Sequence, residues 1–452
     1  LRIRTLATVL LVLLLAMLLV WCEENFGIVE GLFDGGAWPP EPPEPAVVDL
    51  YDADTSWVWL AIVPAATGLL LCGCLLAGLI GLGCTRSEQA EFHLPLRRIA
   101  WTIPVVLFLG LVLLFPVVIW WKLMHPSPIP HVTLPEPNGY NDIVAAGEMV
   151  LESSLLNMAV GPTSTAQLAA ELAKYSVAYE LCRRGLSRSS WHPNYFRRDV
   201  PVMDSFQITL GEIQAFRAAA RALSRECQFA RQEGRFADAA RSACDAIHVG
   251  EVAGRGGLIV DYLVGIAVQG FGHHDLHRVT GQLDAEQCRL CIAELQQTEP
   301  DGESLEDVFY RERVWSENAY GWYGHLGLIL ADLADSDLFG VSESIREAIS
   351  PRHQAITRLL TVELALQAFQ QERGAYPEHL DELVPRVLPQ VPRDPFAAAG
   401  QPLTYRRTDN GYLLYSWGYD RDDDGGTPPS AAAGSVDWMS DGDFRLDVYF
   451  SL

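Results

Sequence analysis

Residues 373–426 constrain the fold of this chain more than any other stretch. Tyr376 is followed by Pro377, and proline disfavours helical geometry in the residue before it, so a preceding helix must end here. Residues 378–384 then predict a short amphipathic helical turn that Pro385 closes. The stretch therefore predicts a helix, a tight turn and a change of secondary structure.

A β-hairpin is predicted immediately afterwards. Residues 403–407 and 412–417 are rich in aromatic and β-prone side chains, and the Asn410-Gly411 pair lies between them. An Asn-Gly pair between two such runs is a strong hairpin signal. We expect a last strand over residues 444–450, joined to the hairpin through an acidic loop.

The order of these motifs resembles the periplasmic domain of the major pseudopilins of type II secretion systems. The matching motifs are a Tyr-Pro turn with two leucines, a Pro-x-Asp-Pro-Phe segment, Pro-Leu-x-Tyr, and a Tyr-x-Leu-Tyr-Ser-x-Gly-x-Asp strand ending in an acidic loop, all within residues 356–452. The resemblance implies a long helix, a small antiparallel sheet and a bound calcium ion. The first apolar run lacks the prepilin-peptidase site of that family, so a pilin-like module joined to another protein is expected.

The acidic loop is the strongest chemical signal from the residues themselves. Asp420, Asp422 and Asp424 alternate and are followed by Gly425, as in calcium loops where alternate carboxylates converge at a sharp glycine turn. Ala431 stands where an EF-hand has its closing glutamate, so this is not an EF-hand. The alternative is an acidic surface loop that binds no metal.

The resemblance supplies the rest of the predicted metal site. In the pseudopilins the acid at the end of the Tyr-x-Leu-Tyr-Ser-x-Gly-x-Asp strand is a calcium ligand, and here it falls on Asp420. Later acids also contribute in that family, and Asp441 and Asp443 are the candidates by position.

Three apolar runs, residues 5–21, 57–83 and 101–121, contain no charged side chain and come close to or exceed the ~20 residues that cross a bilayer. They predict three transmembrane helices. For the first run, a cleaved signal peptide is the alternative, but bulky Trp21 stands near the expected cleavage site. Arginines before the first run and in the loop at 85–100 place the N-terminus in the cytoplasm and residues after 121 outside.

The charge of the chain restricts its partners. Fifty-seven acidic and 33 basic side chains give a formal net charge of −24. Phosphate contacts require a basic surface, so nucleic acid is not expected as a partner.

Helical patterning dominates residues 143–366. Residues 220–247 carry small and apolar side chains at the spacing of a tetratricopeptide-like helical hairpin, with Gly234 at the turn. Residues 258–271 are apolar but too short for a span, and predict a buried core helix.

Two clusters in the helical part offer other chemistry. His273 and His277 lie one helical turn apart and could share a metal, or form a polar patch at a helix end. Cys288 and Cys291 have the spacing of a redox motif, but no strand precedes them, so two cysteines on a packed helix is the alternative.

Together these features predict a membrane-anchored α+β protein with four parts: a three-helix membrane anchor (1–121), a proline-rich spacer (122–139), an α-helical domain (140–350) and a pseudopilin-like α+β domain (351–452). The predicted function is non-enzymatic binding or scaffolding by an integral protein of the cytoplasmic membrane. Its partners would be the lipid bilayer and an envelope protein, with a link to secretion or pilus-like machinery. The alternative is a membrane-anchored hydrolase or redox enzyme with a site at residues 273–291.

Overall fold

The computed structural model divides the chain into two compact units, residues 1–113 and 114–452. The residues that it describes run from 120 to 451, apart from some single residues and the gaps 129–131, 152–163, 196–201, 299–303, 398–399, 433–434 and 437–441, and all of 320–344 except 326 and 329. They all belong to the second unit. The predicted boundary between residues 350 and 351 falls within this unit.

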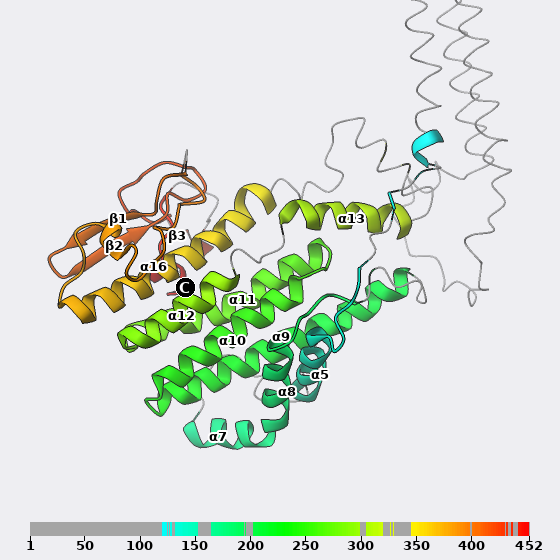
Figure 1. The fold of residues 1–452 in the computed structure, drawn as a ribbon, viewed down its shortest axis with the longest axis horizontal. Helices are drawn as coiled ribbons and strands as arrows, with labels where there is room; N and C mark the ends of the chain where they lie inside the picture. Colours follow the sequence, from blue (N-terminus) through cyan, green and yellow to red (C-terminus); the bar gives the residue numbers. More distant parts are fainter. Residues whose placement is uncertain are drawn as a thin grey trace, which may run out of the picture. The chain divides into compact units, whose positions relative to one another are not determined.

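A helical hairpin forms the middle of the second unit (Figure 1). Helices α9 (Val202–Gln232) and α10 (Phe236–Gly254) pack against each other and are joined by a short turn. Gly234 sits in this turn at φ +73°, a left-handed conformation that costs glycine little. The hairpin predicted over residues 220–247 is confirmed, and its small residues Ala239 and Ala243 are completely buried.

Three helices pack around α9. Helix α5 (Gly139–Leu151) contacts both α9 and α8 (Ser176–Leu186), and α7 (Thr165–Lys174) contacts α9. Ser164 caps α7 by accepting a hydrogen bond from the backbone N–H of Gln167 at 3.3 Å. Apolar side chains of α5, α8, α9, α10 and α11 form one buried core here.

Helix α11 (Ile259–Thr280) lies against α10, and glycines set how closely the two helices approach. A Cβ atom built on Gly265 would lie 2.7 Å from the carbonyl oxygen of Gly250, and one on Gly272 would lie 2.4 Å from that of Ala243. Side chains cannot occupy this interface without moving a backbone. The apolar run 258–271 is therefore part of a packed core helix, as predicted.

Helix α16 (Ser350–Arg373) connects the helical part to the C-terminal part. It follows a π-helical turn, η2 (Ile345–Ile349), and ends at Gly374, which has φ +79°. Between Ala355 and Phe369 every residue is buried except Arg358, Glu363 and Gln367. The sequence predicted that a helix ends before Pro377, and the structure buries this helix on more than one side.

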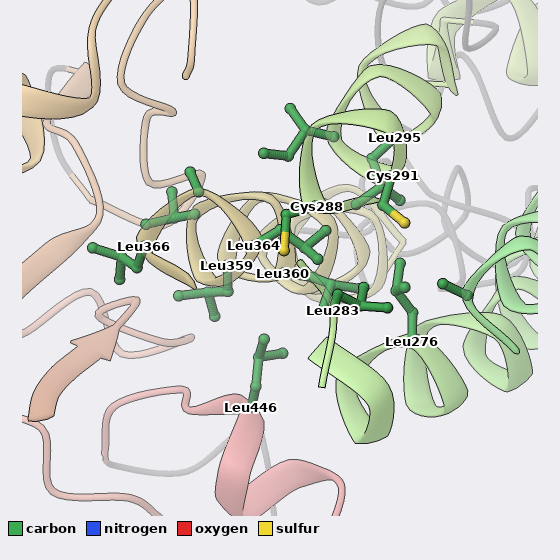
Figure 2. Close-up of a cluster of buried hydrophobic side chains, with 14 of the residues drawn as sticks. Leu276, Leu283, Cys288, Cys291, Leu295, Leu359, Leu360, Leu364, Leu366 and Leu446 are labelled. Atoms are coloured by element: carbon green, nitrogen blue, oxygen red, sulfur yellow. The ribbon is translucent and has the colours of Figure 1, made fainter. Parts of the chain in front are cut away.

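The surroundings of α16 explain this burial (Figure 2). Helices α11 and α12 (Ala285–Thr298) contact one side, where they contribute Leu276 and Cys288 and the loop between them contributes Leu283. Leu446 of the C-terminal segment approaches from another side. Helix α13 (Leu305–Ala319) precedes the turn η2 in the chain and contacts α11 and α9. One hydrophobic core thus continues from the helices into the C-terminal part.

The C-terminal part begins with a 3-10 turn, η3 (Leu380–Leu383), where the sequence predicted a helical turn. Strands β1 (Thr404–Thr408) and β2 (Gly411–Tyr415) pair antiparallel, with Thr408 opposite Gly411. The predicted hairpin is confirmed, and its loop consists of Asp409 and Asn410. Two short strands, β3 (Ala431–Ala432) and β4 (Ser435–Val436), form a second antiparallel pair.

The predicted last strand over residues 444–450 is wrong. Phe444 alone forms a bridge, with Ser416, and the chain then turns into the short helix α17 (Leu446–Tyr449). Helical spacing explains the difference, because one turn brings Leu446 toward α16 while Phe450 packs against the rings of His274 and His277.

The predicted membrane anchor is contradicted. No helix among the described residues is both long and apolar enough to cross a bilayer. The long helices α9, α11 and α16 all carry charged side chains, such as Arg225, Asp261 and Glu363. The three transmembrane helices, the membrane-anchored fold class and the integral-membrane localisation are corrected accordingly. Apart from Trp120 and Trp121, the runs 5–21, 57–83 and 101–121 lie outside the described residues.

Two glycines of α11 allow a direct test of the close α10–α11 contact. Gly272→Ala should lower the free energy of unfolding by about 1–3 kcal/mol, because its methyl group meets the backbone of α10. Gly270→Ala, with no atom within 4 Å of the new methyl group, should instead stabilise the chain by about 0.5–1 kcal/mol through helix propensity. Urea unfolding of both variants measures the difference, and equal effects would contradict the close contact.

Candidate metal centre

A buried aspartate fixes the start of the acidic loop. Asp394 lies in the Pro-Arg-Asp-Pro segment and is 3% exposed. Its Oδ1 accepts hydrogen bonds from the hydroxyl of Ser416 at 2.6 Å and the backbone N–H of Phe396 at 2.9 Å, and its Oδ2 accepts from the N–H of Trp417 at 2.9 Å. This carboxylate therefore holds the end of β2, from which the loop leaves.

Backbone amides organise the loop itself. Asp420 accepts from the N–H of Asp422 at 3.1 Å through Oδ1 and from that of Gly442 at 2.6 Å through Oδ2. Asp423 Oδ1 accepts from the hydroxyl of Tyr415 at 2.8 Å and from the N–H of Gly425 at 3.0 Å. The bond from Gly442 to Asp420 joins the two ends of the acidic segment, and the bond from Tyr415 to Asp423 ties its middle to β2.

Asp443 is the buried member of the group. Its side chain is completely buried, and Oδ2 accepts from the N–H of Gly426 at 2.7 Å. Among the described residues, Oδ1 has no hydrogen-bond partner. Burial, followed by the negative charges of Asp423, Asp424 and Asp420, raises the pKa of Asp443 to about 6. A buried, ionised oxygen without a partner is costly unless a cation is near.

The structure brings together only part of the predicted ligand set. Asp420, Asp424 and Asp443 interact electrostatically, whereas Asp422 is exposed and not among the charges that raise the pKa of Asp443. Asp441 lies outside the described residues. Asp423 was missed, because the alternating pattern assigned the even-numbered aspartates and passed over the one that bonds to Tyr415.

A calcium ion suits the chemistry of these donors, since all are carboxylate oxygens. In the part of the chain that the structure describes, however, no group of three or more His, Cys, Asp or Glu side chains lies close enough to hold a metal ion. The buried oxygen of Asp443 is the feature that fits a cation, and Asp420 and Asp423 are its acidic neighbours.

The two histidines of the second candidate site have separate partners. His273 is buried in α11 and its Nε2 lies 3.2 Å from the hydroxyl of Thr357. His277 Nδ1 lies 2.8 Å from Oε2 of Glu363. Burial lowers the pKa of His273; it opposes protonation of His277 as well, but the bond and charge of Glu363 raise that pKa overall. Both histidines bind α11 to α16.

The cysteine pair lies in the hydrophobic core. Cys288 and Cys291 are both on α12 and buried, and burial raises the pKa of Cys288 to about 12. Cys291 hydrogen-bonds to Cys244 of α10. A reactive thiolate needs a lowered pKa and access to solvent, neither of which Cys288 has. All five described cysteines are free thiols.

A buried polar cluster lies at the start of α11, and no sequence motif predicts it. Asp261 is 2% exposed and accepts a hydrogen bond from the N–H of Leu258 at 2.8 Å. Burial raises its pKa to about 7. His192 Nε2 lies 3.9 Å from Oδ1 of Asp261, and burial lowers the pKa of His192 to about 3. The cluster fixes the first turn of α11 where segments far apart in sequence meet.

No family model, curated protein or solved structure matches this chain. The pseudopilin resemblance of residues 356–452 therefore remains a prediction.

Asp443→Asn should stabilise the calcium-free chain at neutral pH. The native pKa of about 6 lies above the ordinary value of 3.8, so the folded state holds the proton more tightly and ionisation costs stability. In wild type that stability is present below about pH 4 and lost as the pH rises to about 6. At pH 7 the variant should therefore gain about 1–3 kcal/mol.

Chemical denaturation in chelator between pH 4 and pH 7 measures this gain. Asp409→Asn, the same substitution at an exposed residue of the β1–β2 loop, serves as the control. If the difference in free energy of unfolding between wild type and Asp443→Asn is constant across this pH range, ionisation of Asp443 does not destabilise the folded chain.

Proposed function

We propose that this chain is a non-enzymatic binding or scaffolding protein whose C-terminal segment is ordered by a calcium ion. The observation that carries the proposal is the buried Oδ1 of Asp443, which has no partner among the described residues and is surrounded by the charges of Asp423, Asp424 and Asp420. Such a group favours a bound cation, because mutual repulsion and burial both disfavour the ionised carboxylates without one.

Asp443 would be the first ligand of the ion, and its acidic neighbours Asp420 and Asp423 would have to move closer to share it, because the described carboxylates do not yet form a group of three. Asp424 and Asp441 are further oxygen donors close in sequence. When bound, the ion supplies positive charge that offsets repulsion among these carboxylates. The chain contributes the frame: Gly426 and Gly442 adopt φ of +88° and +125°, which lets the backbone N–H groups point at the carboxylates.

The location of the loop gives the ion a structural consequence. It joins the end of β2, held by Asp394, to the segment that carries Phe444 and Leu446 into the core around α16. Order in the loop therefore determines how firmly this last segment docks. We propose that the partner binds to a surface that is complete only when this last segment is docked.

The resemblance to pseudopilins supports the choice of calcium and suggests the kind of partner. It favours a protein partner in secretion or pilus-like machinery, and the excess of acidic side chains disfavours nucleic acid.

Calcium should raise the thermal unfolding midpoint of the purified full-length chain relative to chelator. An ion at a hundredfold excess over its Kd stabilises the folded state by about 2.7 kcal/mol. Asp443→Asn and Asp420→Asn should each remove the calcium dependence, and Asp409→Asn should retain it. Differential scanning calorimetry at pH 7 measures all four proteins.

The combined pattern for Asp443→Asn is specific to a metal site. The variant should unfold at a higher temperature than wild type in chelator and gain nothing from calcium. A wild-type chain with the same unfolding midpoint in calcium and in chelator would refute the proposal, and magnesium in place of calcium tests whether the effect depends on the larger ion.

A further inference from the structure

A second site lies among the helices, away from the acidic loop. A cavity of about 300 Å³ opens between α10, α11 and the first turns of α13 and α16. Its walls include Glu251 and Arg255 from α10, Tyr262 and Gln269 from α11, and His353 and Gln354 from α16. The volume is at the lower end of the range for small-molecule pockets.

Glycines make room for this cavity. Gly250, Gly254 and Gly265 line it where α10 and α11 approach each other. A Cβ on Gly250 would lie 2.5 Å from the side chain of Gln269, and one on Gly265 would lie 2.7 Å from the carbonyl oxygen of Gly250. Because these glycines have no side chains, α10 and α11 pack closely beneath the cavity, and the space beside them stays open.

Polar groups of the wall are available for hydrogen bonding. Within the described part of the chain, the side-chain amides of Gln269 and Gln354 and the ring nitrogens of His353 make no hydrogen bond, although all three side chains are half-buried. Half-buried amides and imidazoles usually bond to protein or solvent. These three offer donors and acceptors to whatever occupies the cavity.

The rest of the wall is already fixed. The Tyr262 hydroxyl donates to Ser350 Oγ at 3.0 Å, and the Thr357 hydroxyl lies 3.2 Å from His273 Nε2. These contacts tie α16 to α11 on either side of His353, so the cavity is formed before any ligand arrives. Preformed sites lose less entropy on binding.

The charges of the cavity cancel. Glu251 and Arg255 form an ion pair with each other on α10. Burial, and then the nearby positive charge of Arg352, lowers the pKa of His353 to about 4, so this ring is neutral at pH 7. Among the described residues that line the cavity, Ile266 and Leu305 are the only large aliphatic side chains. Strongly charged and strongly apolar ligands are both disfavoured.

We propose that this cavity binds a small, neutral, hydroxyl-rich molecule of monosaccharide size, through the amides of Gln269 and Gln354 and the ring of His353. A primary amide presents one donor and one acceptor side by side, which matches a pair of neighbouring hydroxyl groups. The ring of Tyr262 adds an aromatic surface for the C–H groups of such a ligand.

Isothermal titration of the full-length chain with D-glucose, D-galactose, D-mannose and myo-inositol tests the proposal, with glucose 6-phosphate and glucuronate as charged analogues. At least one neutral compound should bind saturably and more tightly than the charged ones. The double variant Gln269→Leu/Gln354→Leu should weaken that binding about tenfold or more, because two hydrogen bonds to the ligand are lost.

The matched control is Gln390→Leu/Gln401→Leu, which makes the same change at two exposed glutamines outside the cavity. It should bind like wild type. Thermal unfolding should show both double variants folded, since the replaced cavity amides have no bond to the described protein. Absence of saturable binding by every neutral compound, tighter binding of a charged analogue, or equal affinity in the cavity variant would overturn the proposal. None of these outcomes depends on calcium.

Discussion

The burial of α16 on more than one side is the constraint on which the rest of the described structure depends. A helix that is apolar around most of its circumference cannot remain at a surface, so other segments must cover it. The α11–α12 pair covers one side and the C-terminal segment another. Even its less buried side chains bond to the covering segments: Arg358 to the carbonyl of Arg393, Glu363 to His277, and Gln367 to the carbonyl of Gly281.

This arrangement relates the two candidate sites to one element. The cavity uses the first turn of α16, through His353 and Gln354, while the acidic loop leads into the segment whose Leu446 packs near the middle of the helix. The sites are built by different physical means. Glycines that let α10 and α11 touch create the cavity, whereas carboxylates held by backbone amides create the loop. A substitution in the cavity therefore leaves the residues of the acidic loop unchanged, and the reverse also holds.

Local sequence signals predicted the elements that depend on local physics. The α9–α10 hairpin, helix α16, the turn after Tyr376 and the β1–β2 hairpin follow from helical spacing, proline and a two-residue loop, and all are present. The last strand failed because Leu446 and Phe450 obey helical spacing in a segment too short to show a period. The predicted membrane anchor is contradicted as well; it rested on the length of the charge-free runs and on the placement of arginines around them.

The candidate sites were less predictable, because they depend on contacts between segments that are distant in the sequence. Alternating aspartates pointed to the acidic loop, but which carboxylate is buried depends on how Gly426 and Gly442 fold back, so Asp443 was one candidate among several and Asp423 was missed. The cavity could not be predicted, because its walls come from residues 250–269, 304–305 and 350–357, which meet only in the folded chain. Asp261 and His192 likewise meet only in the folded chain.

A helix enclosed by two segments also determines how the molecule comes apart. Because the α11–α12 pair and the C-terminal segment cover α16, we expect its backbone amides to reach solvent only after one of these covers has detached. They should therefore be among the slowest to exchange with deuterium, and their exchange should report the opening of the unit as a whole. The outer end of strand β1, residues 406–408, is exposed and should exchange faster. The free energy of local opening should thus be highest at α16 and fall with distance from it, and residues 444–450 are part of what covers this helix.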